Sequence, residues 1–199
     1  LLIVLLAALF SILLVENFKT KQKTNYYNQQ IKAAQVMKTS IETIKKHRKE
    51  LGIPINKDHD PNQTGVIGKE YTPLTTTLGN LESKRTALNP DFAAVMVKYY
   101  QKIGLEEGDY IGIGASGSFP GLILATLSAS KVLKLKPIVI YSIGASTYGA
   151  NIPDFTFIEM LDVLNKENVF PYKIKAVSLG GNLDKAKGLL TEDSKEVFK

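Results

Sequence analysis

Short apolar stretches alternate with longer helical patterns through the second half of this chain. The predicted strands span 110–114, 137–143 and 172–179, and the predicted helices span 120–133, 154–165 and 182–190. Strands that are joined by helices lie parallel, because each connection is a right-handed crossover. We therefore predict an α/β fold with a mainly parallel, Rossmann-like sheet of βαβ units.

One tetrapeptide occurs twice in this region. Ile113-Gly-Ala-Ser116 recurs as Ile143-Gly-Ala-Ser146, and the third predicted strand ends in Ser178-Leu-Gly-Gly181. The spacing of the two copies matches one βαβ unit of about 30 residues. Three small-residue loops are therefore expected at the carboxyl edge of the sheet, where open parallel sheets bind their ligands.

These loops predict an anion site. Glycine lets the backbone approach a ligand closely, and helix N-termini offer unpaired N–H groups. The predicted ligand-binding residues of the loops are Gly114, Ser116, Gly117, Ser118, Gly144, Ser146, Asn151, Gly180 and Gly181. The expected ligand is a phosphate or a carboxylate. The alternative is that the small residues only form tight turns.

A second group of polar residues precedes the sheet. Thr76, Thr77, Lys84 and Arg85 are predicted to contribute to the binding of a polyanion. The alternative for this group is a β-rich segment followed by a solvated helix face.

The first loop resembles a serine nucleophile elbow. Gly114-Ala-Ser116-Gly-Ser118 departs from G-x-S-x-G only at its last residue, which makes Ser116 a candidate nucleophile. A base is not evident, because the two histidines, His47 and His59, belong to distant segments. Gly112, Gly114 and Gly117 fit the dinucleotide pattern only loosely, so no cofactor is predicted. With no cysteine and two histidines, no metal site is predicted either.

Residues 1–15 are apolar except for Ser11. We predict a transmembrane anchor over residues 1–16. A span needs about 20 residues, so the anchor is expected to continue before Leu1, and the chain is expected to be part of a longer protein. The alternatives are a cleaved signal peptide and a buried core helix.

Residues 17–52 are predicted to form a basic, amphipathic helical stalk. Residues 17–50 hold nine lysines and arginines against two glutamates, whereas residues 51–199 are neutral overall. The charge therefore favours anionic lipid head groups near the stalk over nucleic acid. Its apolar stripe fits a coiled coil that forms a homo-oligomer, and equally a helix packed on its own domain. The stripe comprises Tyr27, Ile31, Ala34, Met37, Ile41, Ile44 and Leu51.

Residues 53–199 are predicted to form the α/β domain, incomplete at its C-terminus. We expect a single-pass protein of the cell membrane. Three lysines after the apolar run favour a cytoplasmic domain, but a single N-terminal anchor more often leaves its domain outside. We expect the domain on the outer side.

Several long motifs resemble the bacterial poly-γ-glutamate system protein family. They are Tyr71-Thr-Pro-Leu-Thr-Thr-Thr-Leu-Gly-Asn-Leu-Glu-Ser-Lys-Arg-Thr86, Gly112-Ile-Gly-Ala-Ser-Gly-Ser-Phe-Pro120, Ile140-Tyr-Ser-Ile-Gly-Ala-Ser-Thr-Tyr-Gly-Ala-Asn151 and Ser178-Leu-Gly-Gly-Asn182. The resemblance covers roughly 70–190. It implies an accessory protein of capsule synthesis or export, whose partners are the ligase and membrane subunits of the synthase. It implies no catalytic residue.

The function expected from the sequence is binding of a glutamyl group or polymer end of poly-γ-glutamate at the strand-end loops. Two alternatives stay open. One is a serine-dependent hydrolase or transferase of γ-glutamyl bonds, and the other is a scaffold that assembles partners through the stalk.

Overall fold

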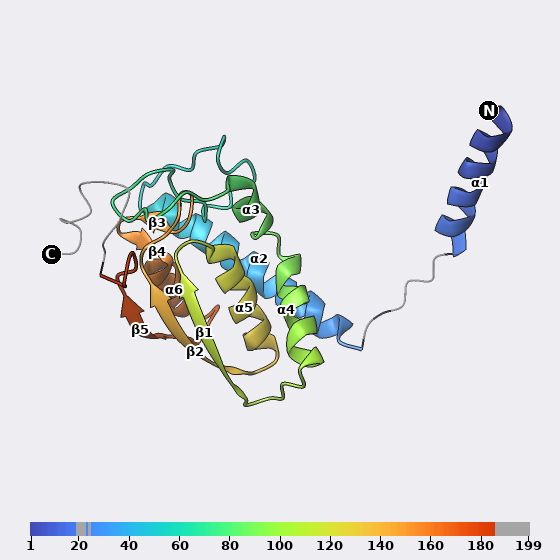
Figure 1. Cartoon of the computed structure of the whole chain (residues 1–199). Coiled ribbons are helices and arrows are strands. Elements are labelled where there is room, and N and C mark those ends of the chain that lie inside the picture. The colour runs from blue at the N-terminus through green and yellow to red at the C-terminus, as the bar shows by residue number, and fades with distance from the viewer. Residues whose placement is uncertain (19–22, 24, 186–199) are drawn as a thin grey trace.

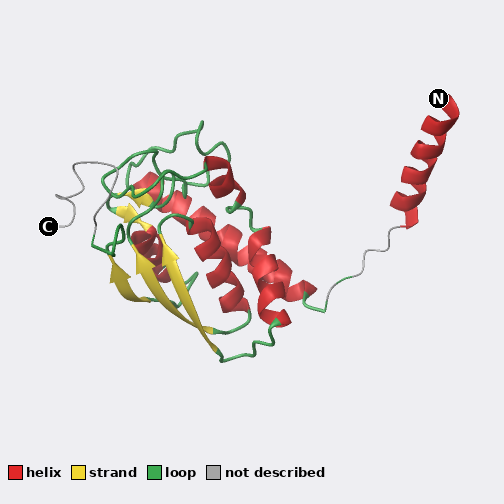
Figure 2. Ribbon diagram, viewed as in Figure 1, coloured by secondary structure: helices red, strands yellow, loops and turns green. Residues whose placement is uncertain are grey.

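The computed structural model describes residues 1–18, 23 and 25–185. Its helices are α1 (Leu2–Phe18), α2 (Tyr27–Glu50), α3 (Leu81–Thr86), α4 (Asp91–Lys102), α5 (Pro120–Val132) and α6 (Phe157–Lys166). Its strands are β1 (Tyr110–Ser116), β2 (Lys136–Ser142), β3 (Asn151–Ile152), β4 (Phe155–Thr156) and β5 (Ile174–Ser178). The larger sheet lies in front of a helical layer (Figures 1 and 2).

The three longer strands form one parallel sheet in the order β1-β2-β5. α5 connects β1 to β2, and α6 connects β2 to β5. Because the chain moves across the sheet in one direction, right-handed crossovers place both helices on the same face. The predicted α/β fold with a parallel sheet of βαβ units is confirmed.

Only one face of this sheet is covered in the part of the chain that the structure describes. Val139 and Tyr141 point into the helical layer and are fully buried. Ile138 and Ile140, which alternate with them along β2, are exposed. Parallel strands are usually covered on both faces, and the continuous apolar run over 137–143 is typical of such strands.

α2 is part of the domain core and not a separate stalk. It packs against α4, α5 and α6. Ala33, Met37, Ile41 and Ile44 belong to the same hydrophobic core as the sheet. The predicted boundary at residue 52 is therefore wrong, and the alternative of a helix packed on its own domain is correct for Tyr27–Glu50. The helix ends near Gly52 as predicted, where φ is +69°.

α1 buries none of its residues. No helix among the residues described is long and apolar enough to cross a membrane. The anchor over residues 1–16 therefore stays a prediction. Lys19 and Lys21, which were expected to flank it, lie outside the described residues.

Two details of the α/β region differ from expectation. A small antiparallel hairpin of β3 and β4 precedes α6, and Asp154 turns it with a φ of +59°. α6 therefore starts at Phe157, where Thr156 and Glu159 form a capping box. The predicted helix over 182–190 begins as a turn, and its residues after 185 lie outside the described part.

Candidate functional site

The segment that precedes α3 crosses the carboxyl edge of the sheet. Thr75 pairs with Ala145 in a parallel bridge. The Thr76 N–H donates to the Ala145 carbonyl at 2.9 Å, and the Thr147 N–H donates to the Thr77 carbonyl at 2.9 Å. The loop after β2 thus lies beside the threonine segment, which the sequence analysis treated as a separate group.

The backbone N–H groups of these loops are already occupied. The Gly117 N–H donates to the Ser142 carbonyl at 3.1 Å, and the Ser146 N–H donates to the Ser118 hydroxyl at 3.0 Å. The Gly144 N–H donates to the Leu179 carbonyl at 3.2 Å. Because a backbone N–H carries a single hydrogen, the expected anion cradle of free N–H groups is not formed by these donors.

Lys84 lies at the centre of the assembled loops and is only 2% exposed. Its Nζ donates to the Ser146 hydroxyl at 2.8 Å and to the Ser118 carbonyl. It also lies 4.5 Å from the centroid of the Phe119 ring. No carboxylate among the described residues pairs with it. Burial lowers the pKa of Lys84 to about 8, because the charged amine loses its hydration.

Gly79 covers this lysine. A Cβ at residue 79 would lie 2.8 Å from both the Lys84 Cε and the Ser146 Oγ. The Gly79 N–H donates to the Thr147 hydroxyl at 2.7 Å, and that hydroxyl donates to the Gly79 carbonyl at 3.2 Å. Thr147 therefore holds the Gly79 backbone against the pair formed by Lys84 and Ser146.

Ser116 and Asn151 have other surroundings than the sequence suggested. The Ser116 hydroxyl accepts from the Ser118 N–H at 3.4 Å. With Gly114 and Phe119, Ser116 lines a small cavity of about 230 Å³ that contains no histidine. The Asn151 side chain is fully buried, and its oxygen accepts from the Lys69 N–H at 3.0 Å. Asn151, in β3, therefore fastens the loop that contains Lys69, and none of its side chain is exposed.

Gly144 serves the packing of the loops, whereas Gly180 and Gly181 serve their turn. A Cβ at Gly144 would lie 2.6 Å from the Thr76 Cγ2. Gly180 has a φ of +79°, and its N–H donates to the Asp184 carboxylate at 2.8 Å. Gly181 is exposed, with a φ of +75°.

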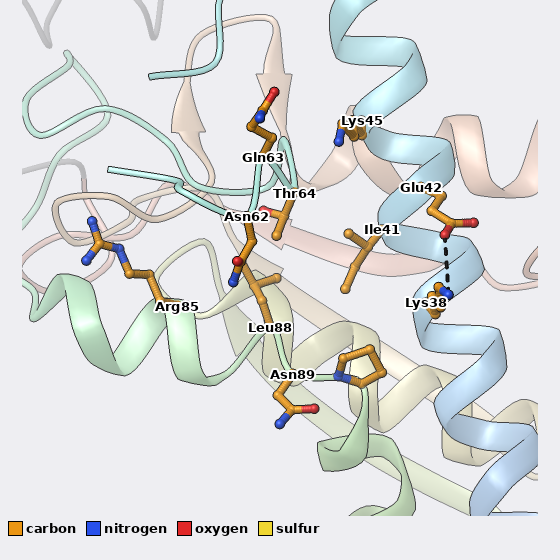
Figure 3. Close-up of a pocket in the computed structure, with 11 residues that line it drawn as sticks. Lys38, Ile41, Glu42, Lys45, Asn62, Gln63, Thr64, Arg85, Leu88 and Asn89 are labelled. Carbon is orange, nitrogen blue, oxygen red and sulfur yellow. Dashed lines mark ion pairs between the residues drawn. The ribbon is translucent and has the colours of Figure 1, made fainter. Parts of the chain in front are cut away.

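Arg85 lines a different feature, the cleft that Figure 3 shows, which we call the basic cleft. The cleft has a volume of about 440 Å³ and lies between α2, the loop over 62–64 and residues 85–90. Lys38, Lys45 and Arg85 are its cations, and Glu42 is its carboxylate. The sequence did not single out Lys38 and Lys45, although their spacing of seven places them on one face of a helix.

Arg85 is held by groups of the chain itself, whereas Lys38 has only a loose partner. Arg85 donates to the His59 carbonyl at 2.8 Å and to the Asp58 carbonyl, and it pairs with Glu82. The Lys38 ammonium lies 4.0 Å from the Glu42 carboxylate, and both side chains are exposed. Such an exposed pair is worth little and competes poorly with a ligand.

Arg48 fixes the loop that forms one wall of the cleft. Its guanidinium is buried and donates to the carbonyls of Gly65, Ile67 and Pro54 at 3.0, 2.6 and 2.8 Å. Burial lowers the pKa of Arg48, and the nearby Asp60 opposes this shift. Asp60 in turn accepts from the N–H groups of Thr64 and Gly65.

Comparison of the chain with models of protein families, with curated proteins and with solved structures finds no match.

Proposed function

We propose that this chain is a membrane-attached accessory protein of poly-γ-glutamate synthesis or export, and that it binds the anionic glutamyl chain in the basic cleft. The excess of cations over carboxylates in the cleft carries this proposal. The motifs over roughly 70–190 that resemble the poly-γ-glutamate system family support the choice of polymer. That resemblance also implies its partners, the ligase and membrane subunits.

The chemistry of the cleft matches the repeat of this polymer. Each γ-glutamyl unit carries one free carboxylate, one amide and two methylene groups. Lys38, Lys45 and Arg85 are suited to the carboxylates, and the side-chain amides of Asn62 and Asn89 to the backbone amides. The cleft also contains Ile41, Leu88 and Pro90, which offer apolar contact to the methylenes.

Attachment to the membrane is proposed for α1. Its large apolar side chains are exposed over all 17 residues of the helix. Each methylene that moves from water into lipid contributes about 0.8 kcal/mol. Exposed lysines of α2, such as Lys32 and Lys49, are suited to anionic head groups. We place the α/β domain on the outer side of the cell membrane.

The packing of the domain disfavours the two alternatives to a binding function. A scaffold built on a coiled coil of α2 would need Met37, Ile41 and Ile44 at its seam, and these residues are in the domain core. A hydrolase based on Ser116 has no base in its cavity. Neither observation affects the binding proposal.

The proposal is tested by titrating the full chain, in detergent micelles, into a fluorescent γ-glutamate oligomer. We expect saturable binding that weakens as salt rises, because exposed charge pairs are screened. The matched control is the same oligomer with its side carboxylates converted to amides, which should not bind. Equal binding of the charged and the amidated oligomer would contradict the proposal.

A further inference from the structure

Lys84 and Ser146 form an isolated amine–hydroxyl pair. Their Nζ and Oγ atoms are 2.8 Å apart, although the residues are 62 positions apart in the chain. Ser146 is 6% exposed and Lys84 is 2% exposed, and both lie directly beneath Gly79, which is itself partly exposed. The proposed binding function uses neither residue.

The surroundings of Lys84 favour its neutral form more than those of an ordinary lysine. Burial disfavours the ammonium, and no carboxylate of the described chain pairs with it. The Ser118 carbonyl and the face of the Phe119 ring favour the ammonium and only partly offset this effect. The pKa of Lys84, about 8, leaves a substantial neutral fraction at mildly alkaline pH. A neutral amine at hydrogen-bond distance can accept the proton of a serine hydroxyl.

A second hydroxyl lies next to the pair. The Ser118 Oγ accepts from the Ser146 N–H at 3.0 Å. A serine hydroxyl also has one hydrogen to donate, so Ser118 is available to donate to the carbonyl oxygen of an amide that Ser146 attacks. Gly79 contributes no side chain between the pair and the surface, and a Cβ there would contact both residues.

We infer that Ser146 is an acyl-transfer nucleophile and that Lys84 is its base. Ser146 Oγ bonds to the carbonyl carbon of an amide while its proton moves to the neutral Nζ of Lys84. The C–N bond then breaks, and the Lys84 ammonium returns the proton to the departing amine. Water or a second amine then attacks the acyl carbon and gives its proton to neutral Lys84. The bond between that carbon and Ser146 Oγ breaks, and the Lys84 ammonium returns the proton to Ser146 Oγ. The choice of a γ-linked glutamyl amide as substrate rests on the proposed function.

The test uses a fluorophosphonate probe, which carries no glutamyl group, on the full chain in detergent micelles. We expect one adduct, mapped by peptide mass spectrometry to Ser146, and its absence in Ser146→Ala. The labelling rate should rise with pH with a midpoint near 8, since only neutral Lys84 acts as a base.

Variants of Lys84 separate a base from a structural cross-link. Lys84→Met should slow labelling about 100-fold, the usual contribution of a positioned base. Lys84→Arg keeps hydrogen-bond donors at this position, but arginine does not lose its proton, so this variant should also label slowly. The matched control is Lys131→Met. Lys131 is on α5 and donates to the Val169 carbonyl, away from Ser146. This variant should label at the wild-type rate.

Three results would overturn the inference: no adduct in the wild-type chain, an adduct at Ser116 or Ser118 instead, or full labelling in a folded Lys84→Arg chain. The wild-type adduct and its pH profile decide the matter even if the lysine variants fail to fold. Labelling of Ser146 without oligomer binding would remove the proposed function alone. Oligomer binding without labelling would remove this inference alone.

Discussion

Lys84 and Arg85 are consecutive residues of α3, but their side chains lie at different sites. Lys84 contacts Ser118 and Ser146 at the strand-end loops, whereas Arg85 lines the basic cleft. One short helix therefore separates a buried amine from an exposed polar cleft. The two sites can therefore be altered independently by mutation.

Stability should depend on the protonation of Lys84. Its pKa is about 8 in the folded chain against 10.5 for an ordinary lysine, so between these values the unfolded chain binds more protons. The free energy of unfolding contributed by Lys84 should therefore rise with pH from about 8 to 10.5 and be flat below. Urea unfolding at pH 7.5 and 9.5, compared with Lys84→Met, isolates this contribution. An equal difference between the two proteins at both pH values would contradict it.

Removal of the Arg48 guanidinium should destabilise the domain strongly. Arg48→Ala leaves the carbonyls of Gly65, Ile67 and Pro54 without their donor, two of them in buried bonds. We expect a loss of about 3 kcal/mol or more in urea unfolding, because each unsatisfied buried group costs about 1–3 kcal/mol. Lys49→Ala, at the exposed neighbouring position, is the control and should change stability by less than about 0.5 kcal/mol. A loss below about 1 kcal/mol in Arg48→Ala would contradict the assigned role.

Gly144→Ala should destabilise the loops through a single steric contact. The new Cβ would lie 2.6 Å from the Thr76 Cγ2, and its next neighbour is the Leu179 carbonyl oxygen at 3.3 Å. We expect a cost of about 1–3 kcal/mol. Thr76→Ser removes the clashing methyl group, so the double variant should recover most of the loss. If the double variant is no more stable than Gly144→Ala, the contact is not the cause.

Deletion of residues 1–18 should release the chain from membranes and leave the domain fold intact. α1 buries no residue, so the melting temperature of the truncated chain should match that of the full chain. Fractionation of cells and carbonate extraction measure the attachment. Recovery of the truncated chain in the membrane fraction would show that another surface holds it there.

The sequence predicts the parallel sheet well, because strand and helix periods alternate and the tetrapeptide repeats. The sequence predicts the packing of α2 poorly. The narrow apolar stripe of α2 suits both a coiled coil and a domain helix. The buried face of α2 also includes Ser40 and Arg48, which no hydrophobic pattern reveals. The two-residue strands of the hairpin are too short to leave a periodic signal.

The sequence also predicts only part of the candidate sites. The strand-end loops were predicted from glycine and serine, and the structure brings them together. The sequence does not show that the threonine segment occupies one of their N–H groups, or that Lys84 meets Ser146 across 62 positions. Such pairings depend on tertiary contacts that no local pattern encodes.

Binding of the glutamyl chain in the basic cleft is tested most directly by a pair of matched charge removals. Lys38 and Lys46 lie on the same helix, and each forms an exposed i,i+4 pair with a glutamate. Of these two lysines, Lys38 lines the cleft and Lys46 does not. Lys45 also lines the cleft. Lys38→Gln with Lys45→Gln should weaken γ-glutamate oligomer binding about 10-fold, since each exposed ion pair is worth about 0.2–1 kcal/mol.

Lys46→Gln with Lys49→Gln removes the same charge from α2 outside the residues that line the cleft. The decisive measurement is the ratio of the dissociation constants of these two double variants, taken by fluorescence anisotropy at one salt concentration. We expect a loss of affinity for the cleft variant and near wild-type affinity for the control. Equal affinities for the two double variants would contradict it.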